Sequence, residues 1–307
     1  MQKLFLLILT VGLALPFSTD PSQSGQTRPI EAPVNTPPDS DSQLLEIGHA
    51  SKIRSVAQSP GNIKVVSYNI RWRSGEDLRK LAQLLKNDSE IGGASIIGLQ
   101  EVDRHKARTG NQNTVKFLAE ELGMYYAWAA PPAAKSETEE ETGVVLLSFY
   151  PLTDVHRIVL PYEGPGRRRR VAVGATLRIG QTSLRVYSVH SDSRIPIDQK
   201  LVQMKAPLNH LAHYRKEMPA IVVGDLNTWE REAVAKTFKL FTTESFHTPF
   251  DDQPTFFRKV LFVSVDLKLD WIWLRNLDDT SYGINRKIGL SDHWPLWLVM
   301  RMKQGKP

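Results

Sequence analysis

Cysteine is absent from the 307 residues of the sequence. Its absence excludes a disulfide framework, a thiolate nucleophile, a cysteine-ligated zinc site and an iron–sulfur cluster. A long hydrophobic run is also missing, because the N-terminal apolar stretch covers residues 4–17 and a membrane-spanning helix needs ~20 residues. Neither sign of charge dominates: 39 Lys and Arg against 33 Asp and Glu give a net charge of +6, which only weakly favours phosphate-bearing or acidic partners.

The first 43 residues differ in composition from the rest of the chain. Lys3 followed by the apolar stretch is typical of a secretory signal, so we expect a signal peptide over residues 1–18 and a secreted or periplasmic protein. An uncleaved N-terminal anchor is the alternative. Residues 19–43 contain five prolines and few large apolar side chains, which predicts a flexible linker. We therefore expect one folded domain, residues 44–307, without an integral membrane domain.

Short apolar runs bounded by turn residues predict a series of β-strands. They lie at residues 63–68, 96–99, 144–147, 171–177, 184–189, 220–223, 269–274 and 294–300. Apolar residues at helical spacing predict helices over residues 77–85, 113–122 and 200–214. This alternation indicates a mixed α/β protein. The runs between residues 144 and 189 follow one another without a helix, so we expect antiparallel pairing there.

Polar residues follow these strands at the points where the strands end. They are Asn69, Glu101, His190, Asp225, Asn227, Asp270, Asp292 and His293. Polar groups at one end of buried strands build a site above a rigid scaffold. Hard oxygen ligands suit Mg²⁺, with Mn²⁺ or Ca²⁺ as alternatives, and a paired imidazole and carboxylate suit general base catalysis. The set therefore predicts metal-assisted attack of water on a phosphoester.

Each motif taken alone has an ordinary structural interpretation. Gly224-Asp225-Leu226-Asn227 has the composition of a turn, and Ser291-Asp292-His293 could cap a helix. The functional interpretation depends on the order of the whole set, which spans 225 residues from Asn69 to His293, each member at the end of an apolar run.

The ordered motifs resemble those of the endonuclease/exonuclease/phosphatase superfamily, the deoxyribonuclease I-like family. The motifs are Ser-Tyr-Asn69, Gly-Leu-Gln-Glu101, Val-His190-Ser-Asp, Gly-Asp225-Leu-Asn227, Leu-Asp270-Trp-Ile and Ser-Asp292-His293. The resemblance covers residues 63–302, nearly the whole expected domain. It implies an α/β (α+β) fold, a four-layer sandwich of two packed mixed β-sheets with outer helices. It also implies Mg²⁺-dependent hydrolysis of phosphoesters.

The resemblance also implies a role for each motif residue. The metal shell would consist of Glu101, Asn69 and Asp292. Asp225 would orient or activate the water or serve the leaving group, and Asn227 and His190 would bind phosphate oxygens. His293, oriented by Asp270, would be the general base or a phosphate contact, so the base stays open between Asp225 and His293. The His190 motif departs from the family's frequent Thr-His-Leu-Asp, which affects the expected substrate contacts.

Basic residues near these motifs bear on the substrate. Arg170 opens a strand after three further arginines, and the family often has an arginine there, so we expect Arg170 to contact phosphate. A basic rim would consist of Arg104, Lys106 and Arg108. The acidic segment 137–141 would oppose a polyanion. The alternating tryptophans at positions 271, 273, 294 and 297 are expected in the core.

The leading hypothesis is an exported nuclease, a monomer acting on nucleic acid. One alternative is a lipid phosphodiesterase of the sphingomyelinase kind or an inositol or sugar phosphate phosphatase. The apolar run 261–265 would then be an exposed hairpin, although a buried strand is the simpler interpretation. The second alternative is a non-catalytic phosphate-binding scaffold. The complete polar set argues against it, because clustered carboxylates without a metal repel one another.

Overall fold

The structure is a computed structural model, and it describes residues 44–54, 61–132, 141–260 and 263–302. The predicted signal peptide, the predicted linker and most of the acidic segment 137–141 lie outside the described residues. Within these ranges, no helix is both long and apolar enough to cross a lipid bilayer.

The described chain contains strands, helices and two 3₁₀ turns. The strands are β1 Leu45–His49, β2 Ile63–Asn69, β3 Ile96–Arg104, β4 Tyr125–Ala129, β5 Glu141–Ser148, β6 Leu152–Val159, β7 Val171–Ile179, β8 Thr182–His190, β9 Ala220–Asp225, β10 Phe256–Val260, β11 Val263–Leu267, β12 Asp270–Arg275, β13 Leu277–Ile284 and β14 Leu296–Met302. The helices are α3 Gly75–Asn87, α4 Thr114–Leu122, α5 Ile197–Leu211 and α6 Arg231–Thr243, and the 3₁₀ turns are η1 Ala107–Thr109 and η2 Pro165–Arg167.

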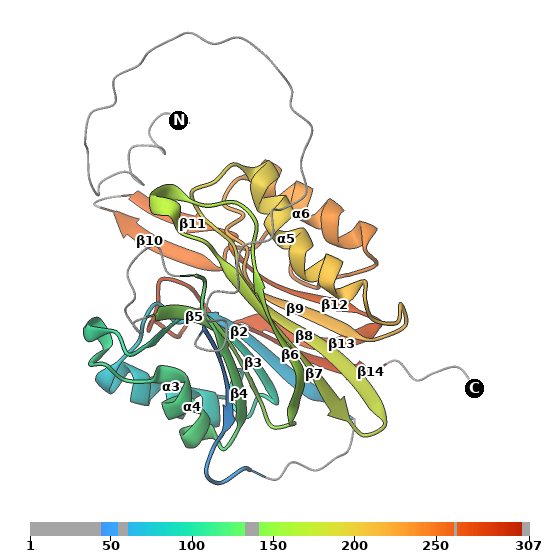
Figure 1. Cartoon of the computed structure of the whole chain (residues 1–307). Helices are drawn as coiled ribbons and strands as arrows, with labels where there is room; N and C mark the ends of the chain where they lie inside the picture. Colours follow the sequence, from blue (N-terminus) through green and yellow to red (C-terminus); the bar gives the residue numbers. More distant parts are fainter. Residues whose placement is uncertain (1–43, 55–60, 133–140, 261–262, 303–307) are drawn as a thin grey trace, which may run out of the picture.

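Two mixed sheets form the centre of the molecule. One has seven strands in the order β1-β4-β5-β3-β2-β14-β13, and the other has five in the order β12-β9-β8-β7-β6. Helices α3 and α4 lie on the outer side of the seven-stranded sheet, and α5 and α6 lie outside the five-stranded sheet (Figure 1). Strands β10 and β11 pair separately as a hairpin. The predicted four-layer sandwich is confirmed.

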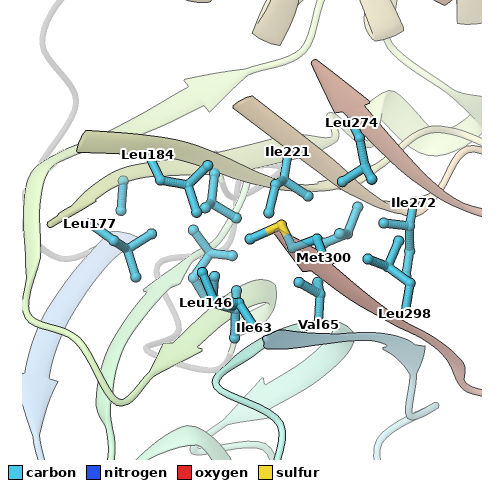
Figure 2. Packing of buried hydrophobic residues seen from close by; sticks show 14 of the residues in the cluster. Ile63, Val65, Leu146, Leu177, Leu184, Ile221, Ile272, Leu274, Leu298 and Met300 are labelled. Atoms are coloured by element: carbon cyan, nitrogen blue, oxygen red, sulfur yellow. The ribbon is translucent and has the colours of Figure 1, made fainter. Parts of the chain in front are cut away.

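The main core fills the space between the two sheets. Alternate residues of the strands point into it, so that Val65 and Met300 of one sheet face Ile221 and Ile272 of the other (Figure 2). Burial of apolar area removes water from both inner faces and supplies the main stabilising term of the fold. Two further clusters attach the helices to the outer faces of the sheets.

The helices follow the apolar spacing of the sequence. Leu78, Leu81 and Leu85 of α3 are fully buried against the seven-stranded sheet. Helix α4 begins where the Asn113 side chain accepts a hydrogen bond from the Lys116 amide at 3.1 Å, and it ends at Gly123, whose φ of 68° suits glycine. The three predicted helices are confirmed with slightly different ends.

The predicted antiparallel pairing is partly right. Strands β6, β7 and β8 are antiparallel neighbours, as expected. Strand β5, however, lies in the other sheet, where it pairs antiparallel with β3 and β4. The predicted strand over residues 294–300 begins at Leu296, and Trp294 is therefore outside it and only partly buried. Trp271 and Trp273 are fully buried, as expected.

Strand register brings the predicted polar residues together. Strands β8 and β9 are parallel, and His190 pairs with Asp225 across them. Strand β12 lies antiparallel on the other side of β9, and Asp270 also pairs with Asp225. In the seven-stranded sheet, β2 and β3 are parallel, with Asn69 opposite Gln100. Polar strand ends from both sheets therefore meet at one edge of the sandwich.

Candidate active site

Asp225 lies between two buried histidines. Its Oδ2 is 3.6 Å from His190 Nε2 and 3.7 Å from His293 Nε2. The other ring nitrogen of His293, Nδ1, is 2.8 Å from Asp270 Oδ2. All four residues are at most 6% exposed. They form a row in which carboxylates and imidazoles alternate.

Thr255 fixes the carboxylate that orients His293. Its hydroxyl donates to Asp270 Oδ2 at 2.7 Å and accepts hydrogen bonds from the backbone amides of Leu269 and Asp270. The residue next to it, Phe256, forms a β-bridge with His293. No sequence pattern pointed to Thr255, because a threonine in a Pro-Thr-Phe context is typical of ordinary loops and strands as well.

The two groups beside Asp225 differ in protonation. Burial alone would lower the pKa of His293, but the charges of Asp270 and Asp225 outweigh it and raise that pKa to about 10. Burial, together with the charge of Asp270, raises the pKa of Asp225 to about 7. Burial and the positive charge of Arg170 hold the pKa of His190 well below its usual value. At neutral pH, His293 is therefore an imidazolium and His190 is a neutral imidazole.

Asn69 connects the two sheets at the site. Its Nδ2 donates to Asp225 Oδ2 at 3.0 Å and to Glu101 Oε1 at 3.3 Å. Glu101 lies on a bulge of β3, where its φ is 56°. Such a backbone conformation is unusual for a residue with a side chain and is often found at functional sites. The bulge turns the Glu101 side chain toward Asn69.

The donor set around Glu101 fits a divalent cation. Two carboxylates, Glu101 and Asp225, share one amide donor, and Glu101 forms no ion pair in the described part of the chain. Concentrated carboxylate oxygens of this kind are the ligands that Mg²⁺ prefers. Asp225, Asp270 and His293 also have ligand atoms within 4.8 Å of one another. Because the His293 imidazolium already offsets one of the two carboxylate charges, that group is better suited to hold a proton than a metal.

Asp292 is placed differently from the other predicted metal ligands. Its Oδ2 forms a 2.7 Å ion pair with Arg71 Nη1. The Arg71 backbone amide in turn donates to Asn69 Oδ1 at 3.1 Å. Asp292 is therefore linked to Asn69 through Arg71, a residue that the sequence analysis did not select.

Arg170 and Asn227, which were predicted to contact phosphate, lie beside this row of carboxylates and imidazoles. Arg170 Nη1 lies 3.4 Å from His190 Nδ1. Because a guanidinium can only donate hydrogen bonds, Nδ1 of His190 is the acceptor in this contact. The proton of the neutral His190 ring is therefore on Nε2, the nitrogen that faces Asp225. The backbone N–H of Asn227 donates to Asp225 Oδ1 at 3.0 Å, and the side-chain Nδ2 of Asn227 donates to the Ser191 carbonyl at 2.9 Å. Buried Lys200 holds the Asn227 carbonyl at 2.9 Å.

The predicted basic rim is largely paired with carboxylates. Arg104 forms an ion pair with Glu46 at 3.1 Å. Arg108 donates two hydrogen bonds to the buried carboxylate of Asp103, at 2.7 and 2.8 Å. The charges of Arg104 and Arg108 are therefore already paired with carboxylates of the protein itself.

The sequence model of the Endonuclease/Exonuclease/phosphatase family matches residues 66–293. The chain belongs to this family. The match contains every strand end that builds the site, from Asn69 to His293. Members of the endonuclease/exonuclease/phosphatase family hydrolyse phosphoester bonds, so this family member is a phosphoesterase. No curated protein is similar enough in sequence to match.

Solved structures of family members share the fold at low sequence identity. A family protein from Beutenbergia cavernae DSM 12333 is 16% identical, with a TM-score of 0.61 over 78% of this chain and 72% of that chain. The human Nocturnin catalytic domain with bound sulfate is 19% identical, with a TM-score of 0.58 over 78% and 94%. ANGEL2, a 2′,3′-cyclic phosphatase in complex with adenosine-2′,3′-vanadate, is 13% identical, with a TM-score of 0.59 over 85% and 99%.

Proposed function

We propose that this protein is a Mg²⁺-dependent phosphodiesterase that cleaves nucleic acid. The observation that carries the proposal is the buried Asp225 carboxylate, which contacts Asn69 on one side and faces the imidazoles of His190 and His293 on the others. A base, an acid and a cation-binding carboxylate thereby surround one point at the edge of the sandwich.

We expect the metal ion to be bound by side chains of the seven-stranded sheet. Glu101 and Asn69 would hold the ion, and Asp292 joins them only if it gives up its ion pair with Arg71. A bound Mg²⁺ would supply charge neutralisation at the phosphate and would lower the pKa of a nearby water.

The protein's own residues would move the protons. Asp225 takes a proton from water as the water oxygen bonds to phosphorus, since a carboxylate with a pKa of about 7 is a suitable base near neutral pH. The ester P–O bond breaks, and the leaving oxygen takes a proton from the His293 imidazolium. Neutral His190 donates its Nε2–H to a phosphate oxygen. The N–H of the Asn227 side chain that does not bind the Ser191 carbonyl donates to another phosphate oxygen.

Nucleic acid is the favoured substrate on the basis of charge and of two relatives. The net charge of +6 favours a polyanion. The ANGEL2 structure contains an adenosine ligand, and the Nocturnin structure contains a phosphate-like sulfate. The second candidate, a phospholipid head group, is supported by Phe257, which is 39% exposed on the hairpin that pairs with the His293 segment.

Hydrolysis assays with a panel of phosphoesters test the proposal. We expect Mg²⁺-dependent nicking of plasmid DNA and cleavage of single-stranded oligonucleotides, both abolished by a chelator. His293→Ala should lower the rate at least ~100-fold, the lower range for loss of one acid–base group. His49→Ala, which changes an exposed histidine on β1, is the matched control and should retain wild-type activity.

Each other outcome has a definite meaning. If folded wild-type protein hydrolyses no phosphoester, the proposed function is wrong. Release of phosphocholine without cleavage of nucleic acid would establish the lipid alternative. A His293→Ala variant with a near-wild-type rate would overturn the role of His293.

Export is part of the proposal and depends on the apolar stretch at residues 4–17. Sequencing the N-terminus of protein recovered outside the cytoplasm tests it, and retention of the full chain inside the cell would contradict it.

A further inference from the structure

Trp72 is an exposed tryptophan beside the candidate active site. It is 36% exposed and is the one tryptophan among the exposed large apolar side chains of the described residues. It follows Asn69, the end of β2, by three residues. By contrast, Trp128, Trp271 and Trp273 are fully buried. An exposed indole at this place requires an explanation, because apolar surface near a site usually serves binding.

The backbone that carries Trp72 is in an unfavourable conformation. Arg71 has a φ of 45° and Trp72 a φ of 57°, so two consecutive residues with large side chains lie in the left-handed region. Strain of this kind persists only when surrounding contacts fix it, and it clusters at ligand-binding positions.

Hydrogen bonds to the site fix this turn. The Arg71 amide donates to Asn69 Oδ1 at 3.1 Å, and the Trp72 amide donates to the Glu101 carbonyl at 3.0 Å. The Arg73 guanidinium donates to the Arg71 carbonyl at 2.9 Å. Trp72 is thus anchored to the two residues proposed to hold the metal, at a fixed place relative to the scissile phosphate.

The indole ring is supported by an arginine that is itself immobilised. Arg108 Cζ lies 4.0 Å from the centroid of the Trp72 ring. Arg108 is held by its two hydrogen bonds to Asp103 and by a third to Thr142 Oγ1 at 2.9 Å. The Arg108 guanidinium therefore lies over part of the ring, as does that of Arg71 at 5.6 Å, and the residue remains 36% exposed.

We infer that Trp72, backed by Arg108, is a stacking platform for an unpaired nucleobase next to the scissile phosphate. This inference rests on the proposed function and narrows its substrate to single-stranded or locally unpaired nucleic acid, because only an unstacked base can lie on the ring. A choline head group would also stack on an indole, and release of phosphocholine without cleavage of nucleic acid would favour it instead.

Paired substrates with and without bases test the platform. One substrate is a single-stranded oligothymidylate, and the other is an oligomer of the same length and charge made of abasic units. We expect Trp72→Ala to raise KM for the oligothymidylate about 10-fold, within the range for loss of one base stack, and to leave KM for the abasic oligomer unchanged. Trp72→Phe should recover part of the loss. Tyr282→Ala, an exposed aromatic on the edge strand β13, is the control.

A binding assay separates failure of the platform from failure of the catalytic proposal. Fluorescence anisotropy with labelled oligothymidylate and labelled abasic oligomer needs no turnover. If Trp72→Ala weakens binding of the oligothymidylate alone, the platform stands even for a protein that cleaves no nucleic acid. If the variant, folded as judged by thermal unfolding, binds and cleaves both oligomers like the wild type, or loses both equally, the platform is wrong.

Discussion

Asp225 is the residue on which the other site groups converge. One of its oxygens faces Asn69, His190 and His293, and the other accepts the Asn227 amide. These contacts fix the carboxylate in one orientation. Burial disfavours its charge while the nearby imidazolium favours it, which leaves the pKa of Asp225 at about 7. At neutral pH, about half of the Asp225 side chains therefore carry the charge that a general base needs.

Thr255→Val tests whether the Thr255 hydroxyl orients Asp270 and, through it, His293. The substitution keeps the shape but leaves the Leu269 and Asp270 amides without their acceptor, so we expect a loss of ~1–3 kcal/mol in the free energy of unfolding. Asp270 would also hold His293 less firmly, so the pKa of His293, measured by NMR of the imidazole, should fall and kcat should decrease. Urea titrations and kinetics complete the measurement.

The matched control for that change is Thr237→Val. Thr237 is equally buried, but its hydroxyl contacts only the Met204 sulfur at 3.5 Å, so the substitution should affect neither stability nor kcat much. If Thr255→Val lowers stability while the pKa of His293 stays unchanged, Thr255 supports the fold and not the catalytic pair.

At the scale of elements, the strands that could be predicted from the sequence are mostly buried strands with continuous apolar runs. Three of the missed strands, β1, β6 and β13, are sheet edges whose residues are largely exposed or half-buried, whereas the missed strand β4 is internal and largely buried. Edge strands carry polar residues such as Asp154 and His156, so their sequences lack the continuous apolar run from which a strand is predicted. Helix α6 was missed although Ala233, Thr237 and Phe241 are buried, with Val234, Phe238 and Leu240 partly buried against the same cluster.

The site follows the same logic. Residues at the ends of buried strands were predictable, because strand ends of one sheet meet at one edge. Thr255 and the ion pair between Arg71 and Asp292 were not, since they depend on contacts that no local pattern encodes. The β-bridge between Phe256 and His293 joins residues 37 positions apart.

Helix α5 joins the five-stranded sheet through a histidine that gives stability a pH dependence. His210 Nδ1 lies 2.9 Å from the Tyr187 hydroxyl, and its ring packs 4.7 Å from that of His156. Burial, Arg185 and two neighbouring histidines lower the pKa of His210 to about 4, despite the opposing charge of Asp154. The unfolded chain, with a pKa of ~6.5, binds this proton more readily. Stability from His210 is therefore complete above pH ~6.5 and is lost as the pH falls toward 4.

We expect the melting temperature of His210→Gln to fall less between pH 7 and pH 5 than that of the wild type, because the variant has no proton to gain there. Differential scanning calorimetry at the two pH values measures the difference. His49→Gln, on an exposed histidine, should behave like the wild type. Parallel curves for wild type and His210→Gln would show that His210 does not set this dependence.

At the scale of the whole molecule, both sheets contribute residues to the site. Asn69 and Glu101 come from the seven-stranded sheet, and His190, Asp225 and Asp270 come from the five-stranded sheet. The Gln100 side chain bridges the sheets by donating to Ser188 Oγ at 3.1 Å. The distance between base and metal ligands is consequently set by how closely the two sheets pack.

Gly98 controls that packing just below the site, three residues before Glu101. A Cβ at this position would lie 2.2 Å from Val223 Cγ2 on the opposite sheet, closer than atoms can approach. Gly98→Ala should therefore separate the sheets locally, lower the free energy of unfolding by ~1–3 kcal/mol and reduce kcat, because Glu101 moves away from Asp225. Gly289→Ala, whose added Cβ would meet no atom within 4 Å apart from its chain neighbours, is the neutral control.

Val223→Ala removes the methyl group that a residue-98 side chain would meet. Alone it should destabilise the protein by leaving space between the sheets, but combined with Gly98→Ala it should recover much of the lost stability and activity. The double-mutant cycle, from urea unfolding and kcat of all four proteins, should give a favourable coupling of ~0.5–3 kcal/mol. Additive losses would mean that Gly98 is required for the backbone of β3 itself and that sheet spacing does not govern the site. Recovery of both quantities together would show that catalytic geometry here is a property of the packed sandwich.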